Sequence, residues 1–134
     1  MAQPLSIFDI SGRAMAAQLV RLNATASNLA NAGTVSGSES GAFRALKPVF
    51  RTEVGSNGTA TVAVDRMTSS TTAPTKRHDP SHPLADKNGD IWEAAVDSAA
   101  ELVEMIETSR QYQNNVQVLQ TAKNLVADTL RLGQ

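Results

Sequence analysis

The chain has 134 residues, with 12 Lys and Arg residues against 13 Asp and Glu residues, so its formal net charge is −1. This length gives room for one ordinary domain. The even balance of charge argues against a protein that binds nucleic acid or a membrane surface, because such proteins carry a basic face. Aromatic residues make up only 4% of the sequence and cysteine is absent. These two facts disfavour a core built on large rings and exclude disulfides and thiolate metal sites.

The first segment, residues 5–32, is rich in Ala and Leu and contains no Pro, so we expect it to form a helix. Asp9, Ser11 and Arg13 interrupt its first apolar cluster, which argues against a cleaved signal peptide. Its apolar and small residues are spaced alternately by four and three positions, which is typical of a helix that packs along a partner. This seam consists of Phe8, Gly12, Met15, Leu19, Leu22, Ala26 and Leu29.

The middle segment, residues 33–90, holds most of the glycines and prolines and is expected to contain loops and a β-hairpin. Residues 43–53 and 59–71 are the two predicted strands. The sequence Gly-Ser-Asn-Gly at 55–58 suits the turn between them, because glycine and asparagine tolerate positive φ angles. A lone hairpin is marginal in water, so it needs the helices or another subunit to lie on.

The last segment, residues 91–132, contains neither Pro nor Gly and is predicted to be a second long helix. Two apolar stripes run along its distal half with the same alternating spacing. One stripe can face the first helix, and the other then needs a different partner, because a monomer would leave it exposed to water. The stripes are Met105, Ser109, Tyr112, Val116, Leu119, Lys123, Val126 and Leu130, and Val118, Ala122, Leu125, Thr129 and Leu132.

Together these segments predict a mainly α fold. Two long terminal helices are expected to pack as a coiled-coil-like pair, with a small irregular β-hairpin segment between them. Residues 1–134 are expected to act as one subunit.

Metal binding is a weak alternative for the segment before the last helix. His78 and His82 lie near Asp79 and Asp86, which supplies the residue types of a two-His, two-Asp site. Two prolines break this segment, and nothing suggests support for the ligands from surrounding residues. We therefore expect no metal.

Calcium binding and catalysis have even less support. Residues 86–90, Asp-Lys-Asn-Gly-Asp, share the start of a calcium loop, but Ile91 stands where that loop requires glycine. A turn leading into the helix explains the same residues. The sequence has no Gly-x-Ser-x-Gly motif and no phosphate-binding glycine loop, so we expect neither an enzyme nor a cofactor.

Several stretches resemble flagellar rod and hook proteins, and two of these stretches resemble one member of that family in particular. The two that point to one member are residues 7–12, Ile-Phe-Asp-Ile-Ser-Gly, and residues 79–86 with Gly89. The general family signatures are Leu22-Asn23 with residues 26–32, Ala-Ser-Asn-Leu-Ala-Asn-Ala; residues 109–115, Ser-Arg-Gln-Tyr-Gln-Asn-Asn; and the closing residues 130–134.

This resemblance implies a structural subunit of the proximal rod in the bacterial flagellar basal body. It implies assembly by helix packing into the drive shaft that carries torque from motor to hook. The expected partners are proximal and distal rod subunits, the basal adaptor, further copies of the chain, and the flagellar type III export apparatus. The resemblance also implies a periplasmic location reached without leader cleavage, and terminal segments that are poorly ordered before assembly. The alternative is a soluble helical adaptor or chaperone that binds one partner helix.

The candidate interface residues are of two kinds. Apolar seams stabilise helix packing but do not select one register of the two helices. Polar residues can select the register, because a buried amide without a hydrogen-bond partner is costly. Intrachain capping and ordinary exposure remain the alternative for the polar residues, and an ion pair with Glu104 or Glu107 remains the alternative for Arg110. Glu101, Glu104 and Glu107 are expected to form a solvated acidic face. The candidates are Phe8, Met15, Leu19, Leu22, Leu29, Val116, Leu119, Val126 and Leu130; Asn23, Asn28, Asn31, Gln113 and Asn115; and the anchors Arg110 and Tyr112.

Overall fold

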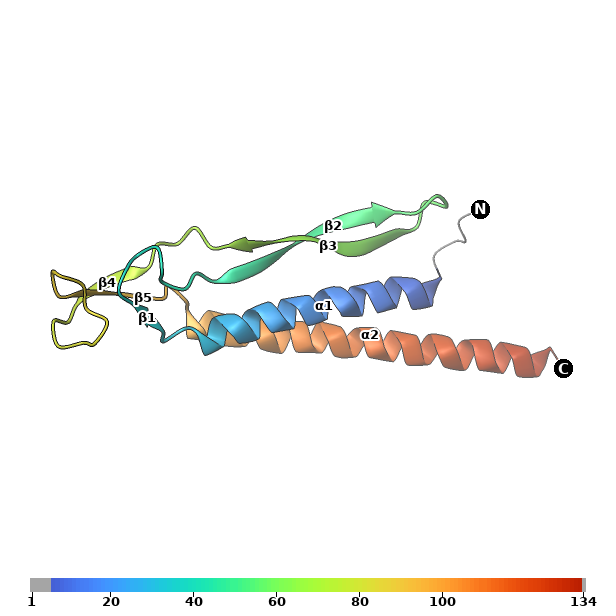
Figure 1. Cartoon of the computed structure of the whole chain (residues 1–134). Helices are drawn as coiled ribbons and strands as arrows, with labels where there is room; N and C mark the ends of the chain where they lie inside the picture. The colour runs from blue at the N-terminus through green and yellow to red at the C-terminus, as the bar shows by residue number, and fades with distance from the viewer. Residues whose placement is uncertain (1–5, 134) are drawn as a thin grey trace.

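A computed structural model describes residues 6–133, and the expected helix start at residue 5 lies outside this range. The molecule is elongated, with a tip of short strands at one end and both ends of the described chain at the other (Figure 1). The elements in chain order are α1 (Ile7–Ala30), β1 (Val35–Ser36), β2 (Leu46–Val54), β3 (Ala60–Ser69), β4 (Thr75–His78), β5 (Asp90–Glu93) and α2 (Ser98–Leu132).

The long part of the molecule has three layers, with α1 between the other two. The hairpin β2–β3 packs along one side of α1, and α2 packs along another (Figure 1). Because α2 has 35 residues and α1 has 24, the C-terminal turns of α2 extend beyond α1.

Both helices begin at side chains that satisfy free backbone amides. Ser6 accepts from the N–H of Asp9, and the Asp9 carboxylate accepts from the N–H of Ser6, which forms a capping box. Asp97 accepts from the N–H groups of Ala99 and Ala100 and so starts α2.

The expectation of a mainly α fold with a small irregular hairpin is wrong. The described residues form five strands in two antiparallel sheets, one with the order β1-β5-β4 and the other made of β2 and β3. The hairpin is long and well paired, from Leu46 opposite Ser69 to Val54 opposite Ala60, with one irregularity after Val49.

The second error concerns the start of the last helix. Residues 90–93 were assigned to the turn and the helix, but they form β5, which pairs with β4 on one side and β1 on the other. This pairing buries Ile91 completely, at 0% exposure. Burial of Ile91 in the tip therefore outweighs the helix propensity of the segment, and the helix begins only after the cap at Asp97.

The core is thin and consists of small side chains. Among residues 6–133, every buried apolar residue except Ile91 is an alanine, and the larger Leu, Val and Met side chains lie half-buried or exposed. Small residues let the helices and the hairpin approach closely but bury little apolar area. Among the residues that the structure describes, no helix combines the length and apolar character needed to cross a membrane. The buried alanines are Ala17, Ala24, Ala42, Ala45, Ala94 and Ala122.

Candidate assembly surface

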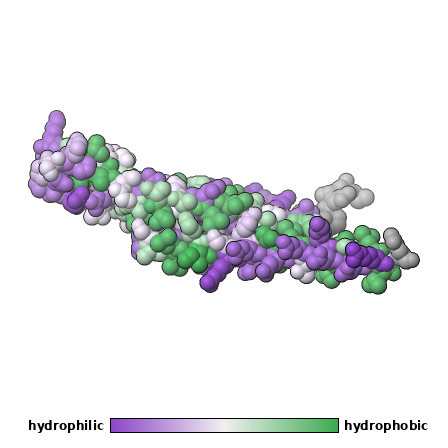
Figure 2. All heavy atoms as spheres, turned by 90° about the horizontal axis from the view of Figure 1, so that it is seen from below, coloured by the Kyte–Doolittle hydropathy of each residue, from purple (hydrophilic) through white to green (hydrophobic). Residues whose placement is uncertain are grey.

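The accessible surface is large for the mass of the chain. It amounts to 8868 Å² for 14.2 kDa, whereas a compact monomer of this mass exposes about 6,800 Å². Fourteen large hydrophobic side chains are exposed among the described residues. Figure 2 shows hydrophobic side chains over the helical part and again toward the C-terminal end, whereas the tip is mainly hydrophilic. The helical part thus carries apolar surface that the single chain does not cover.

One such area lies on the distal part of α2, and we call it the distal strip. Within it, Leu125 and Leu130 are 62% and 67% exposed. It contains members of both predicted stripes, so neither stripe is fully covered within the chain. The distal strip consists of Val118, Leu125, Val126, Leu130 and Leu132.

An apolar groove joins the distal strip to the start of α1. It encloses about 620 Å³, and Ile7 of α1 lies opposite Val118 and Leu125 of α2. Ala122 forms part of its wall and is buried. Thus the place where α1 stops covering α2 is a hollow with apolar walls, suited to an apolar side chain from outside.

A second apolar area lies near the start of α2, outside the two stripes predicted from the sequence. Leu102, Val103 and Ile106 are all exposed, and Val103 is 65% exposed. Their spacing places them on one side of the helix. The predicted stripes cover only the distal half of the helix, although the apolar residues 102, 103 and 106 form a pattern of the same kind in the sequence.

The predicted apolar seam of α1 is divided by the structure. Phe8 and Leu19 are exposed, whereas Met15, Leu22 and Leu29 are half-buried. The buried face of α1 is made of different residues, and these were not part of the seam. They are Ser11, Ala17, Ala24, Thr25 and Asn28.

The exposure of the apolar candidates on α2 increases toward the C-terminal end of the helix. Tyr112, Val116 and Leu119 lie where α1 covers α2 and are half-buried, whereas Val126 and Leu130 are exposed. Arg110 is exposed and forms no ion pair with the described acidic residues.

The predicted polar residues other than Asn28 differ in their exposure and bonding. Asn23 and Gln113 are exposed and Asn115 is half-buried, so these three lie where a neighbour can reach them. Asn31 ends α1, and its amide donates to the carbonyl of Ser27 at 2.8 Å.

Asn28 is buried and hydrogen-bonded to two other elements. It is 2% exposed, and its amide bonds to the backbone of Leu46 and to the carboxylate of Glu101. The place of Asn28 in an interface between subunits stays a prediction.

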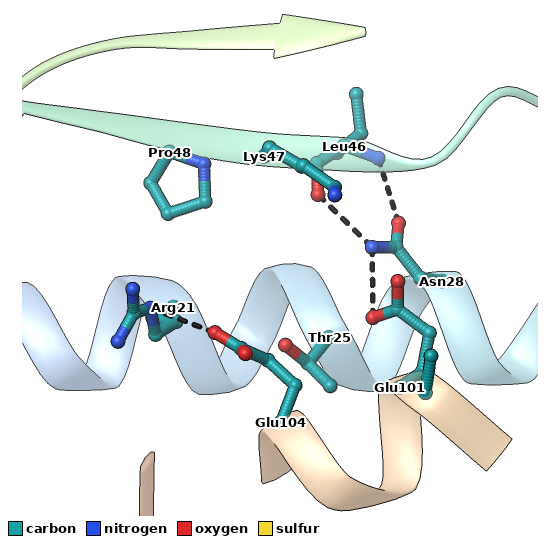
Figure 3. A pocket seen from close by; sticks show the side chains of 9 residues that line it. Arg21, Thr25, Asn28, Leu46, Lys47, Pro48, Glu101 and Glu104 are labelled. Atoms are coloured by element: carbon teal, nitrogen blue, oxygen red, sulfur yellow. Dashed lines mark hydrogen bonds and ion pairs between the residues drawn. The ribbon is translucent and has the colours of Figure 1, made fainter. Parts of the chain in front are cut away.

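The acidic face expected on α2 is not simply solvated. Glu104 forms an ion pair with Arg21, with Nε 3.0 Å from Oε1, and Glu101 accepts a hydrogen bond from the amide of Asn28 at 3.1 Å (Figure 3). Arg21 also lies over the ring of Phe50, 5.4 Å from its centroid. These carboxylates therefore join α2 to α1, a role that depends on residues about eighty positions away and that helix spacing alone cannot reveal.

The tip has its own charge cluster, centred on Asp90. One carboxylate oxygen accepts from Nζ of Lys76 at 2.7 Å, and the other accepts from Nδ1 of His78 at 2.9 Å. The hydrogen bonds from Lys76 and then His78 lower the pKa of Asp90 below its ordinary value of 3.8. Asp86 accepts from the N–H groups of Asn88 and Asp90, which makes residues 86–90 a turn. Within residues 6–133, no group of three or more His, Asp or Glu side chains is arranged to hold a metal.

Comparison with known families defines the class of protein. Residues 8–36 match the family "Flagella basal body rod protein", and residues 88–132 match "Flagellar basal body rod FlgEFG protein C-terminal". The two matches cover α1 and α2, the elements that carry the exposed apolar surface. The class is thus that of flagellar basal-body rod proteins.

Individual relatives narrow the class. The chain is 42% identical to the flagellar basal-body rod protein FlgC of Salmonella typhimurium (strain LT2) over 131 residues, which cover 97% of this chain and 98% of the relative. It is also 42% identical to the FlgC protein of Escherichia coli O6:H1 over 132 residues. The FlgC protein of Buchnera aphidicola subsp. Schizaphis graminum is 37% identical over 134 residues. The chain belongs to the FlgC family of flagellar basal-body rod proteins.

Proposed function

We propose that this chain, a structural subunit of the flagellar rod, joins its neighbours through the exposed faces of α1 and α2. The observation that carries the proposal is the distal strip, where Leu125, Val126 and Leu130 are exposed on the part of α2 that reaches and passes the start of α1. Apolar area buried between subunits stabilises contact by about 25 cal/mol per Å². A helix overhang that is apolar on more than one side is suited to packing against several neighbours at once.

Phe8 and Leu19 on α1, and Leu102, Val103 and Ile106 on α2, extend the proposed interface toward the tip. Apolar contact does not fix the register of two helices, so polar residues beside it are needed. Asn23 and Gln113 are exposed, lie on the two helices and carry amides that can serve this purpose.

Several finer properties belong to the proposal. The partners are proximal and distal rod subunits, the basal adaptor and further copies of this chain, and residues 1–134 act as one subunit in the proximal rod. The chain reaches the periplasmic rod through the flagellar type III apparatus without leader cleavage. Lateral helix contacts give the rod the stiffness to carry torque. Before assembly, the turns of α2 beyond α1 fray, because they lack a packing partner.

The soluble adaptor or chaperone is not favoured, because the relatives are named as rod proteins. The two functions predict different complexes. A rod subunit forms extended assemblies with other rod proteins, whereas an adaptor forms a defined complex with one partner.

Size measurement of the purified chain mixed with other rod proteins tests the proposal. We expect a monomer alone and, after mixing, large assemblies with increased helix content by circular dichroism. A one-to-one complex of fixed size would contradict the proposal. So would strong hydrogen-exchange protection of Leu125 and Leu130 in the isolated monomer.

A further inference from the structure

The side chain of Asn28 connects α1 to two other elements of the fold, β2 and α2. It projects from α1, its carbonyl oxygen accepts from the N–H of Leu46 at 2.7 Å, and its amide nitrogen donates to the C=O of Leu46 at 2.9 Å. The same nitrogen donates to Oε2 of Glu101 in the first turn of α2 at 3.1 Å (Figure 3). Both N–H groups and the carbonyl of the amide are thus in use.

The two bonds to Leu46 have the pattern of a neighbouring β-strand. In an antiparallel pair, successive residues alternate between bonding to the partner strand and pointing away from it. Ala45 accepts from the N–H of Ser70 at 2.7 Å, so the backbone groups of Leu46, the next residue, point away from β3. The Asn28 amide takes the place of a third strand at that free edge.

The third bond connects this edge to α2. Among the described residues, no hydrogen bond or ion pair joins the hairpin directly to α2, although the two line one pocket with α1, so the polar link between them runs through Asn28. The amide is 2% exposed, and loss of one partner would leave buried polar atoms unsatisfied. Its bond to the hairpin and its bond to α2 therefore favour the same side-chain position.

We propose that Asn28 is a positioning residue that couples the place of the β2–β3 hairpin to the pairing of α1 with α2. When the start of α2 docks on α1, Glu101 holds the amide in the orientation that Leu46 requires. When α2 leaves, the amide is freed and the hairpin edge loses its partner. This coupling belongs to the single chain, whichever neighbours cover its helices in the rod.

Amide hydrogen exchange of the full-length chain, resolved by residue, tests the coupling. The decisive variant is Glu101→Ala, because Glu101 makes no hydrogen bond to the hairpin among the described contacts. We expect the Leu46 amide and the start of β2 to exchange about tenfold faster in this variant, since a charge-assisted bond to a buried group is lost. Glu107→Ala is the matched control, because Glu107 accepts only from Gln111 on its own helix, and we expect it to leave Leu46 unchanged.

A second pair of variants tests the amide itself. Asn28→Asp keeps the shape and the acceptor but removes both donors. We expect amide exchange to become faster both at the start of β2 and in the first turn of α2. Asn23→Asp makes the same chemical change at an exposed site on α1 and should do neither. Adding Glu101→Gln to Asn28→Asp restores a donor opposite the carboxylate, so we expect partial recovery of protection in both segments.

The exchange of Ile91 in the tip serves as the internal reference for a folded chain. Equal exchange at Leu46 in the wild type and in Glu101→Ala would overturn the proposal, whether both are protected or both are not. If Asn28→Asp unfolds the tip as well, exchange in the double variant Asn28→Asp, Glu101→Gln tests the coupling instead. Recovery of the start of β2 together with α2 supports the coupling, and recovery of neither contradicts it.

Discussion

The amide nitrogen of Gln18 donates a hydrogen bond to Oε1 of Gln111 at 2.9 Å, across the interface between α1 and α2. Gln111 in turn donates to Glu107 at 3.4 Å on its own helix. Oε1 of Gln18 and Oγ1 of the fully buried Thr108 have no hydrogen-bond partner among residues 6–133. The interface is therefore polar at its centre, and sliding the helices would leave more buried groups unpaired.

Replacement of Gln111 by Leu tests this polar contact. We expect the variant to lose about 1–3 kcal/mol of the free energy of unfolding, because the buried amide of Gln18 then has no acceptor. The double variant Gln18→Leu, Gln111→Leu should lose less than the sum of the two single variants, because residues in contact are coupled. Urea unfolding of the full chain measures both. Additive losses, or a neutral Gln111→Leu, would show that the contact contributes no register preference.

Charge placed in the distal strip should block assembly without unfolding the chain. Leu130 is 67% exposed, so Leu130→Asp should change the stability of the single chain by less than about 0.5 kcal/mol. We expect it to abolish incorporation into the rod while export continues, as judged by the protein content of purified basal bodies and of the periplasm.

Two further variants control for this effect. Leu130→Met keeps the apolar character and should assemble. Leu119→Asp should block incorporation too, but it should also destabilise the monomer, because Leu119 is half-buried. Normal incorporation of Leu130→Asp would remove the distal strip from the interface, and loss of export would place Leu130 in a secretion signal instead.

Two glycines with positive φ angles offer a matched comparison. Gly89 in the tip has a φ of 78°, and an added Cβ would lie 2.9 Å from Cγ of Pro80. Gly58 in the hairpin turn has a φ of 79° with open space around it. We expect Gly58→Ala to cost about 1–2 kcal/mol from backbone strain alone and Gly89→Ala to cost about 2–5 kcal/mol because a clash is added. Thermal unfolding measures both, and equal costs would show that the tip yields to the added methyl group.

The acid sensitivity of the tip should follow Asp90. Its pKa is lowered by Lys76 first and His78 second, so its contribution to stability is present above the unfolded-state pKa and is lost as pH falls through the folded value. Carboxyl carbon titration by NMR should give a pKa below 3.8 for Asp90. Lys76→Met should raise that pKa more than His78→Gln does. A wild-type pKa at or above the ordinary value would mean that the cluster does not form in solution.

The sequence was informative where a pattern is local. The absence of Pro and the alternating spacing indicate two helices, and the Gly-Ser-Asn-Gly turn at 55–58 with alternating residues after it indicates the hairpin at its correct place. The family signatures at the two ends led to the right class of protein. These signals depend on neighbours within a few positions, which is the range over which propensity acts.

What the sequence could not reveal depends on contacts between distant residues. Residues 90–93 continue an apolar run into the helix, and only pairing with residues 75–78 and 35–36 makes them a strand. The same holds for Asn28 and Gln111. The sequence pattern of an amide side chain in a helix is the same whether that side chain faces a neighbouring subunit, a strand edge or water. The sequence therefore does not reveal the bonds that these two amides make within the chain.

The exposure of the distal strip before and after assembly tests the central claim most directly. Hydroxyl-radical footprinting of Leu125, Val126 and Leu130 can be compared between the isolated chain and intact basal bodies. We predict rapid oxidation of all three in the isolated chain and a fall of about tenfold or more in the rod, because neighbouring subunits cover them. Equal oxidation in both states, or slow oxidation in the isolated chain, would contradict the claim that these side chains hold the rod together.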